Sequence, residues 1–239
     1  MVGIGPGHPL DRTKRAELVI SHSDVVVGYK PYIDSISDLT AGKVTISSGM
    51  RQEIERCTKA VKLATTGQVV SLISSGDPGI YGMAGLAIEI AHKSDSRISI
   101  KIVPGVTAAS AAAAALGAPL MTDFAIISLS DLLVSWDQIE KRLHALAQSE
   151  LVTVVYNPKS HTRTEPFFKM IEIFRKYRSG STSVGIVTNA SDSAAKISTI
   201  ELSDLASAEV TMKSVIIICN DQTNRIDNFL VAQRGYQVK

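Results

Sequence analysis

The sequence has few cysteines, few aromatic side chains and no strong excess of charge of either sign. Its two cysteines, Cys57 and Cys219, lie far apart without a CxxC or Cys/His spacing. This argues against a zinc site, an iron–sulfur cluster or a disulfide framework and favours buried free thiols. Aromatic residues make up 5% of the chain and the formal net charge is +2, so the composition suggests neither a nucleic-acid surface nor a membrane surface.

The sequence also lacks an apolar run of about 18 residues, and it does not open with the charged and then apolar stretch of a signal peptide. We therefore expect no membrane span and a reducing cytoplasm as the location. The 239 residues are 45% hydrophobic, which is enough to form one large domain or two small ones.

Short β-branched runs alternate with helical patterns along the chain. Most runs are apolar throughout, as expected for strands that are covered by helices on both faces. They occupy residues 24–28, 43–47, 69–74, 98–105, 124–130, 151–156, 183–189 and 214–220. The helical patterns occupy residues 51–66, 79–93, 136–149 and 163–178. This alternation predicts an α/β fold with mostly parallel sheets.

Small residues dominate segment 106–120, which suits a helix that another backbone or a flat ligand can approach closely. The pattern ends at Gly117 and Pro119, two residues that stop a helix. Because the composition shifts here, we predict an N-terminal α/β domain at 1–118 and a C-terminal α/β domain at 119–239.

The chain opens with a glycine-rich loop, MVGIGPGHPLD. A dinucleotide-binding fingerprint would need a glycine at position 8, where this chain has His8, and the Walker pattern lacks its Gly-Lys-Ser/Thr. Pro6 has no N–H group to offer a phosphate. The loop is therefore expected to be a tight turn, and the residues alone leave open whether it meets a ligand or only packs.

Two further turns, ISSGDPGIYG (73–82) and VPGVTAAS (103–110), follow predicted strands. Asp77 lies at the carboxyl end of a strand, where ligands bind in open α/β sheets, and can accept hydrogen bonds from a ribose or an ammonium group. Asp77 with Pro78 also suits the N-cap and first turn of a helix. Thr107 can likewise cap a helix or contact a ligand.

Polar side chains gather after two predicted strands in the second half of the chain. The first group consists of Ser128, Ser130 and Asp131. Without a neighbouring histidine they indicate helix capping as readily as a hydrolase triad. The second group consists of Asn157, Lys159, His161 and Arg163. Its cationic side chains suit carboxylates or phosphates, although such a loop is usually only solvated.

Taken together, these motifs resemble the tetrapyrrole methylase family. The matching segments are, in order, VGIGPG, DVVVGYKPYID, SSGDPGIYG, VPGVTAASAAAA, YNPKS and TNAS, and they cover nearly the whole chain. Within the family, the sequence is most similar to the precorrin-3B C17-methyltransferase branch. The segments that carry this similarity are GYKPYID, DFAIISLSDLL, VVYNPKS and the VIIICN…RGY ending. The chain departs from common family residues at His8 and Thr122.

The resemblance implies a homodimer of two-domain α/β subunits that bind S-adenosylmethionine and an anionic tetrapyrrole in a cleft between the domains. It implies transfer of the methyl group to C17 of precorrin-3B, or of cobalt-precorrin-3, with contraction of the macrocycle. The product would be precorrin-4 or its cobalt-bearing counterpart, in cobalamin biosynthesis, and both routes stay open. It implies no metal, nucleic-acid or membrane site.

By position, the resemblance implies cofactor contacts at Pro6, Ser75, Gly76, Asp77, Ile80, Thr107, Ala108, Asn157 and Ala190. The substrate contacts that we expect are Gly5, Gly7, Lys30, Arg51, Ser128, Lys159 and Arg163. The cations among them would anchor peripheral carboxylates of the macrocycle. Ring contraction requires proton transfers, for which the candidates are Ser130, Asp131 and His161.

Two other functions compete with this one. Relatives of the same fold can methylate another precorrin position, RNA or a protein, but an RNA substrate would favour a basic stripe with aromatic residues. A tetrapyrrole- or cofactor-binding protein without catalysis is the second alternative. The intact SGDP and PGVTA segments argue against it.

Overall fold

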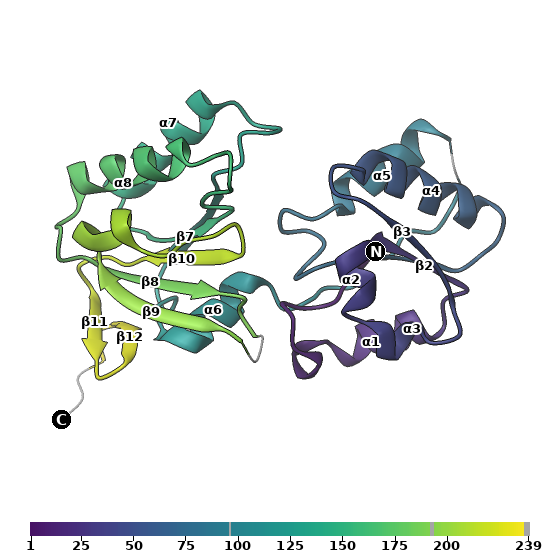
Figure 1. Cartoon of the computed structure of the whole chain (residues 1–239), viewed down its shortest axis with the longest axis horizontal. Coiled ribbons are helices and arrows are strands. Elements are labelled where there is room, and N and C mark those ends of the chain that lie inside the picture. The colour runs from purple at the N-terminus through teal and green to yellow at the C-terminus, as the bar shows by residue number, and fades with distance from the viewer. Residues whose placement is uncertain (96, 192–193, 237–239) are drawn as a thin grey trace. The chain divides into compact units, whose positions relative to one another are not determined.

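The computed structural model describes residues 1–95, 97–191 and 194–236. The chain folds as two compact units, Met1–Ala108 and Ala109–Lys239 (Figure 1). The break therefore falls after the first residue of the small-residue helix α6 (Ala108–Leu116), whereas composition puts it after that helix, near residue 119. In the part of the chain that is described, no helix combines the length and the apolar character needed to cross a bilayer.

The first unit is built on a parallel sheet with the strand order β1-β4-β2-β3. Its strands are β1 (Val2–Gly3), β2 (Val25–Tyr29), β3 (Val44–Ser48) and β4 (Val70–Ser74). Its helices are α1 (Lys14–Ser21), α2 (Lys30–Asp34), α3 (Ser37–Thr40), α4 (Glu53–Thr65) and α5 (Ala84–Lys93), with a 3-10 turn η1 (Pro9–Asp11) before α1. The prediction of a parallel α/β arrangement is confirmed for this unit.

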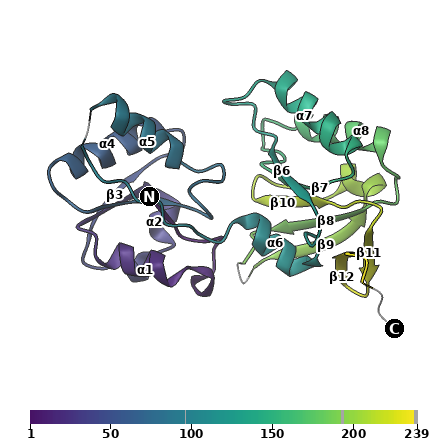
Figure 2. The same cartoon turned by 180° about the vertical axis from the view of Figure 1, so that it is seen from behind.

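Helices cover both faces of the first sheet, with α4 and α5 on one side and α1 and α3 on the other (Figures 1 and 2). Successive residues of β2 point to opposite faces: Val26 packs with Ile20 of α1, whereas Val25 and Val27 pack with Cys57 of α4. Both faces of the strand are thus buried in apolar side chains. This is why the sequence is apolar throughout rather than alternating.

The second unit contains a five-stranded sheet with the order β6-β7-β10-β8-β9. These strands are β6 (Phe124–Ser128), β7 (Val152–Tyr156), β8 (Ser183–Thr188), β9 (Lys196–Glu201) and β10 (Ser214–Ile218). Only β6 and β7 pair in parallel, and the other three pairings are antiparallel. The unit is α/β as predicted, but the expectation of a mostly parallel sheet does not hold here, because β10 inserts antiparallel between β7 and β8.

Helices α7 (Trp136–Gln148) and α8 (Glu165–Tyr177) lie on one side of this sheet and α6 on the other (Figure 2). Leu143, Phe167 and Phe174 bury the α7–α8 side. On the other side, a Cβ at Gly185 would overlap the Leu116 side chain, so the glycine lets α6 approach the strands. A second, three-stranded sheet and a 3-10 turn complete the unit: β5 (Gly117–Ala118), β11 (Thr223–Ile226), β12 (Phe229–Ala232) and η2 (Leu202–Ser207).

The predicted strands and helices are confirmed at most positions, with two exceptions. The run 98–105 forms no regular strand, because its neighbour β1 is only two residues long and Val103 alone bridges to it, at Val2. The helix expected from residue 79 begins at Ala84 instead. Strand β9 and the β11–β12 hairpin were not predicted from the sequence.

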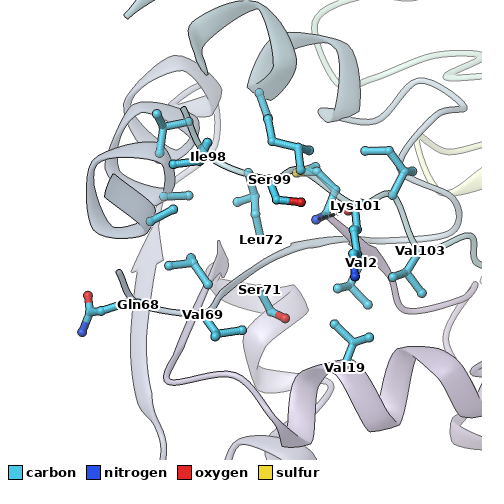
Figure 3. A pocket seen from close by; sticks show the side chains of 18 of the residues that line it. Val2, Val19, Gln68, Val69, Ser71, Leu72, Ile98, Ser99, Lys101 and Val103 are labelled. Atoms are coloured by element: carbon cyan, nitrogen blue, oxygen red, sulfur yellow. Dashed lines mark hydrogen bonds between the residues drawn. The ribbon is translucent and has the colours of Figure 1, made fainter. Parts of the chain in front are cut away.

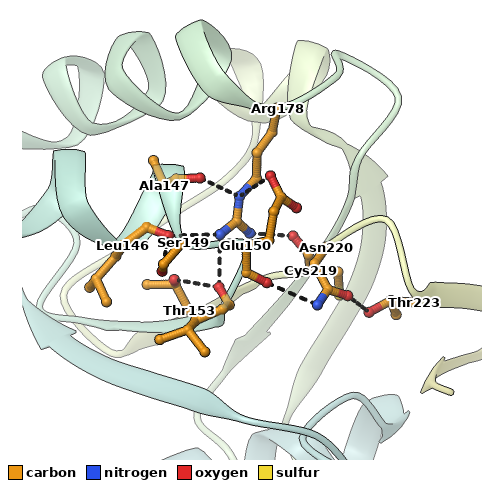
Figure 4. A network of polar contacts seen from close by, with 10 residues as sticks. Leu146, Ala147, Ser149, Glu150, Thr153, Arg178, Cys219, Asn220 and Thr223 are labelled. Atoms are coloured by element: carbon orange, nitrogen blue, oxygen red, sulfur yellow. Dashed lines mark hydrogen bonds and ion pairs between the residues drawn. The ribbon is translucent and has the colours of Figure 1, made fainter. Parts of the chain in front are cut away.

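A buried arginine joins the elements of the second unit at the amino end of β7 (Figure 4). The guanidinium of Arg178 donates hydrogen bonds to the carbonyl oxygens of Leu146, Leu151 and Cys219, at 3.0, 2.8 and 2.5 Å. Burial lowers the pKa of Arg178, and the Glu150 carboxylate, 4.0 Å from Nε, acts in the opposite direction. Arg178 thus satisfies carbonyl groups that the helix end and the strand ends would otherwise leave unpaired.

Both cysteines are free and buried, as predicted. Burial raises the pKa of Cys57 to about 11 and the pKa of Cys219 to about 12. At neutral pH both side chains are therefore protonated thiols, which are poor nucleophiles and poor metal ligands.

Candidate active site

Three turns of the first unit meet at the carboxyl edge of its parallel sheet. Gly5 and Gly76 exchange two backbone hydrogen bonds, of 3.2 Å from Gly5 N to Gly76 O and 2.8 Å from Gly76 N to Gly5 O. The amide of Gly3 donates to the carbonyl of Val103 at 3.0 Å. The loops after β1, after β4 and after Val103 are thus held together by backbone contacts.

Glycine is required for this approach. A Cβ at Gly3 would lie 2.6 Å from the Gly76 carbonyl oxygen, and a Cβ at Gly105 would overlap the same oxygen. Gly5 also has a positive φ of 79°, which favours glycine. The opening loop therefore packs closely against the second and third turns. His8 caps η1, since its Nδ1 accepts a hydrogen bond from Leu10 N at 3.2 Å.

The carboxylate of Asp77 is bonded to backbone on both sides. Oδ1 accepts from Gly79 N at 2.7 Å, and Oδ2 accepts from Gly105 N at 3.0 Å. The alternative that Asp77 caps a helix is wrong, because the N-cap of α5 is Met83. Asp77 instead fixes the second turn against the third.

Gly76 leaves open space beside the third turn. Its φ of +58° is left-handed, and a Cβ built there would lie 3.8 Å from Thr107 Cα and 3.9 Å from Ala108 N. A side chain would occupy this space without a clash. The structure thus brings Gly76, Thr107 and Ala108 together, with Ser75 exposed next to them. Pro6, in the opening loop, and Ile80, in the loop after β4, are half-buried.

Two tyrosines that were not predicted as site residues lie at the carboxyl end of β2, the strand next to β4. Burial raises the pKa of Tyr32, and the side chain of Ser75 acts in the opposite direction. The rings of Tyr29 and Tyr32 meet edge to face with centroids 5.1 Å apart. Both tyrosines belong to GYKPYID, the motif from which Lys30 is the predicted site residue. Lys30 Nζ forms an exposed ion pair with Asp34 at 3.0 Å.

In the second unit, Ser128 is the last residue of β6, Asn157 directly follows β7, and Ala190 lies just beyond the end of β8. β7 and β8 flank β10 in matching register, because Ile216 is paired with residues of both strands. These ends therefore share one edge of the sheet. Asn157, which has a φ of +51°, donates from Nδ2 to Ser128 Oγ at 3.0 Å.

Arg163 connects the ends of β6 and β7. Its Nη1 donates to Leu129 O at 2.6 Å and its Nη2 donates to Asn157 O at 2.8 Å. Nε lies 3.8 Å from Asp131 Oδ1, and the Arg163 side chain is only 18% exposed. The residue expected to anchor a substrate carboxylate is thus already engaged with protein oxygens.

The proposed proton-transfer residues form a looser group. Ser130 is half-buried and its amide donates to Ser128 Oγ at 3.2 Å, while the side chain of Asp131 is 45% exposed. His161 is exposed, and within the described residues no hydrogen bond joins it to Ser130 or Asp131. Lys159 Nζ lies 5.1 Å from the centroid of the Phe167 ring.

A cavity of about 990 Å³ lies elsewhere in the first unit (Figure 3). It is lined by the amino ends of β1 and β4 and by segment 97–103. Its walls are mainly apolar, with Val19, Val69, Leu72 and Ile98 among them. The expected site residues are absent from its lining and lie at the carboxyl ends of the strands. This cavity is therefore not the candidate site of the first unit.

This geometry defines an α/β protein with glycine turns gathered at the carboxyl edge of a parallel sheet, the edge at which such sheets bind ligands. Comparison with known proteins identifies it further. The model of the tetrapyrrole (corrin/porphyrin) methylases matches residues 1–206, and the chain belongs to this family.

Named relatives agree with the family. A probable cobalt-factor III C(17)-methyltransferase from Salmonella typhimurium is 41% identical over 236 residues, which are 99% of this chain and 98% of the relative. The crystal structure of the methyltransferase CobJ superposes with a TM-score of 0.91 at 33% identity, covering 97% of this chain and 98% of that one.

A uroporphyrin-III C-methyltransferase from Thermus thermophilus, solved with S-adenosyl homocysteine, shares the fold with a TM-score of 0.71 at 20% identity. The match covers 91% of this chain and 95% of that one. Two other curated relatives, 40% and 42% identical, are longer proteins, of which this chain spans 45% and 53%.

Proposed function

We propose that this protein transfers the methyl group of S-adenosylmethionine to C17 of a precorrin-3-type macrocycle, with contraction of the ring, in cobalamin biosynthesis. The proposal rests on the 41% identity to a relative named for this activity over 98% of that relative's length. Several relatives are named for cobalt-factor III, which supports the cobalt-bearing form of the substrate over precorrin-3B itself.

The turn around Gly76 fits the cofactor. It offers an exposed hydroxyl at Ser75, backbone groups at Thr107 and Ala108, and space that a Cβ at Gly76 would fill. When bound, S-adenosylmethionine supplies an electrophilic methyl group on a sulfonium. The protein's task is then to hold a nucleophilic ring carbon in line with that methyl, since proximity and orientation can supply most of the rate. The other proposed cofactor contacts are Pro6, Asp77 and Ile80 in the first unit and Asn157 and Ala190 in the second.

The anionic substrate needs cationic partners whose charge is available. Lys30 is paired with Asp34, and Arg163 donates to two carbonyl groups. We therefore assign the peripheral carboxylates to Lys159 and to the exposed Arg51. Ser128, Gly5 and Gly7 remain proposed substrate contacts beside them.

Ring contraction moves protons, and Asp131 is the proposed group that accepts one at its carboxylate. Arg163, 3.8 Å from Asp131 Oδ1, orients that carboxylate. Ser130 and His161 are the proposed second donor and shuttle, both on loops at the carboxyl edge of the second sheet.

Two properties complete the proposal. The family resemblance supports a homodimer, which light scattering of the purified protein tests. The two buried thiols support a reducing cytoplasm as the location, which fractionation of the source cells tests.

Methyl transfer is tested by incubating the protein with S-adenosylmethionine and either precorrin-3B or its cobalt-bearing form. The expected result is a product heavier by one methyl group, with the changed absorption spectrum of a contracted ring. A product mass that stays unchanged with both substrates would overturn the C17 assignment.

A further inference from the structure

The cavity at the amino ends of β1 and β4 lies in line with β1 (Figure 3). β1 itself lies between β4 and Val103, since Val2 pairs in parallel with Ile73 on one side and with Val103 on the other. Beyond the pairs that it forms with β1, β4 continues back to Val70, where β2 is its only strand partner among the described residues. One edge of β4 is therefore open toward the cavity.

The hydrogen bonds beside β1 show where its line continues. Gly3 N donates to Val103 O at 3.0 Å, and Val103 N donates to Met1 O at 2.9 Å. Met1 N in turn donates to Lys101 O at 2.9 Å. A parallel ladder has this even spacing, in which every second residue faces the neighbouring strand. The ladder would continue with Lys101 N and Ser99 O, and both residues line the cavity.

The register of β1 places a further strand between two walls of this cavity. Continued back from Met1 by four residues, which span about 13 Å, the pairing would set that strand opposite residues 68–71 on one side and residues 98–101 on the other. All of these residues line the cavity. The cavity thus has the place and the direction of one more strand parallel to β4.

Helices cover both faces of this place. Val19 of α1 lines the cavity on one side of the sheet, and Ala64 of α4 and Ala87 of α5 line it on the other (Figures 1 and 2). Successive side chains of a strand point to opposite faces, so each of them would meet apolar carbon. Among the described residues that line the cavity, the charged ones are all cationic: Arg15, Arg97 and Lys101. An occupant with apolar side chains and without lysine or arginine therefore fits this lining.

We propose that this cavity is a binding groove for an extended peptide segment of about four apolar, mainly β-branched residues, which adds a strand to the first sheet between β4 and residues 98–101. Backbone hydrogen bonds to the two walls supply affinity, and the apolar faces select the side chains. Segment 98–103 then gains the strand structure that its sequence predicts. The inference goes beyond the proposed function and does not depend on it.

The test attaches the segment Val-Ile-Val-Ile directly ahead of Met1, so that it reaches the groove at high effective concentration. Hydrogen exchange then measures the protection of the backbone amides of residues 98–102, and a thermal melt measures stability. Exchange of these amides should slow by about tenfold or more, because they become part of a paired strand. The melting temperature of the first unit should rise by about 5–10 °C, because four apolar side chains are buried.

Two matched variants distinguish strand pairing from a merely longer chain. The segment Val-Pro-Val-Pro at the same place lacks two amide donors and should leave exchange and melting unchanged. Ala64→Phe narrows the groove, so that adding Val-Ile-Val-Ile to this variant should bring no gain over Ala64→Phe alone.

The inference is overturned if Val-Ile-Val-Ile leaves exchange of residues 98–102 unchanged, or if Val-Pro-Val-Pro protects them equally. Protection of these residues in the unmodified protein that increases with its concentration would identify a second copy of the chain as the occupant, and would also overturn the inference.

Discussion

Replacement of Gly76 by alanine should have two separate effects: backbone strain that lowers folding stability, and a loss of affinity for the cofactor. The residue has a φ of +58°, so any side chain there costs about 1–2 kcal/mol of folding free energy. The added Cβ would contact Thr107 Cα at 3.8 Å and Ala108 N at 3.9 Å, which is ordinary van der Waals distance. The unliganded protein should therefore tolerate Gly76→Ala with a modest loss of stability.

Cofactor binding should respond much more strongly to the same change. If S-adenosylmethionine occupies the space beside Gly76, the methyl group must displace it or distort the turn, which costs about 1–3 kcal/mol. That range corresponds to an affinity loss of about fivefold to more than a hundredfold. Calorimetric titration with S-adenosylmethionine measures the affinity, and a thermal melt of the unliganded protein measures the strain.

Gly67→Ala supplies the control. Gly67 has a φ of +89° and its Cβ would meet nothing within 4 Å, on the connection between α4 and β4. Both variants should lower the melting temperature by a similar amount, about 2–4 °C for each kcal/mol, but only Gly76→Ala should lose affinity. Unchanged affinity in Gly76→Ala would refute the placement of the cofactor at this turn.

Three further predictions concern charged groups. Arg178→Met should destabilise the protein by about 3 kcal/mol or more in urea unfolding, because it leaves buried carbonyl groups unpaired, whereas exposed Arg175→Met should change little. Asp77→Asn should lower both melting temperature and cofactor affinity, since an amide cannot accept at both ends; unchanged values would contradict the role of its two backbone bonds. The Arg12 guanidinium lowers the pKa of Asp38. The unmodified protein should therefore be more stable than Asp38→Asn well above pH 3.8, and this difference in the free energy of unfolding should disappear as the pH falls below that value. A difference independent of pH would contradict this.

The first sheet could be predicted because its sequence signal is local. Val25, Val26 and Val27 are all apolar since the two faces of β2 are both covered, and each following helix returns the chain to a parallel neighbour. The direction of β10 in the second sheet has no such signal. Its residues read as a buried run whether the pairing is parallel or antiparallel, and only the tertiary structure decides.

The candidate site was predictable to the same limited degree. The glycine turns were visible because Gly3, Gly5 and Gly76 stand in motifs, and in the structure backbone contacts hold these turns together. The hydrogen bond from Gly105 N to Asp77 Oδ2 joins two turns that are far apart in sequence and that only the fold brings together. No local pattern encodes that contact.

Arg163 illustrates why a cationic loop cannot be assigned to a substrate from its sequence. A guanidinium presents several N–H groups, and the fold directs two of them to Leu129 O and Asn157 O. A neutral replacement would release both strand ends and with them the Asn157 amide that donates to Ser128. Activity lost on replacing Arg163 would therefore report a displaced loop as readily as a lost substrate contact. Lys159, whose ammonium lies over the Phe167 ring and forms no ion pair among the described residues, is the residue at which a charge-removing substitution reports on the substrate.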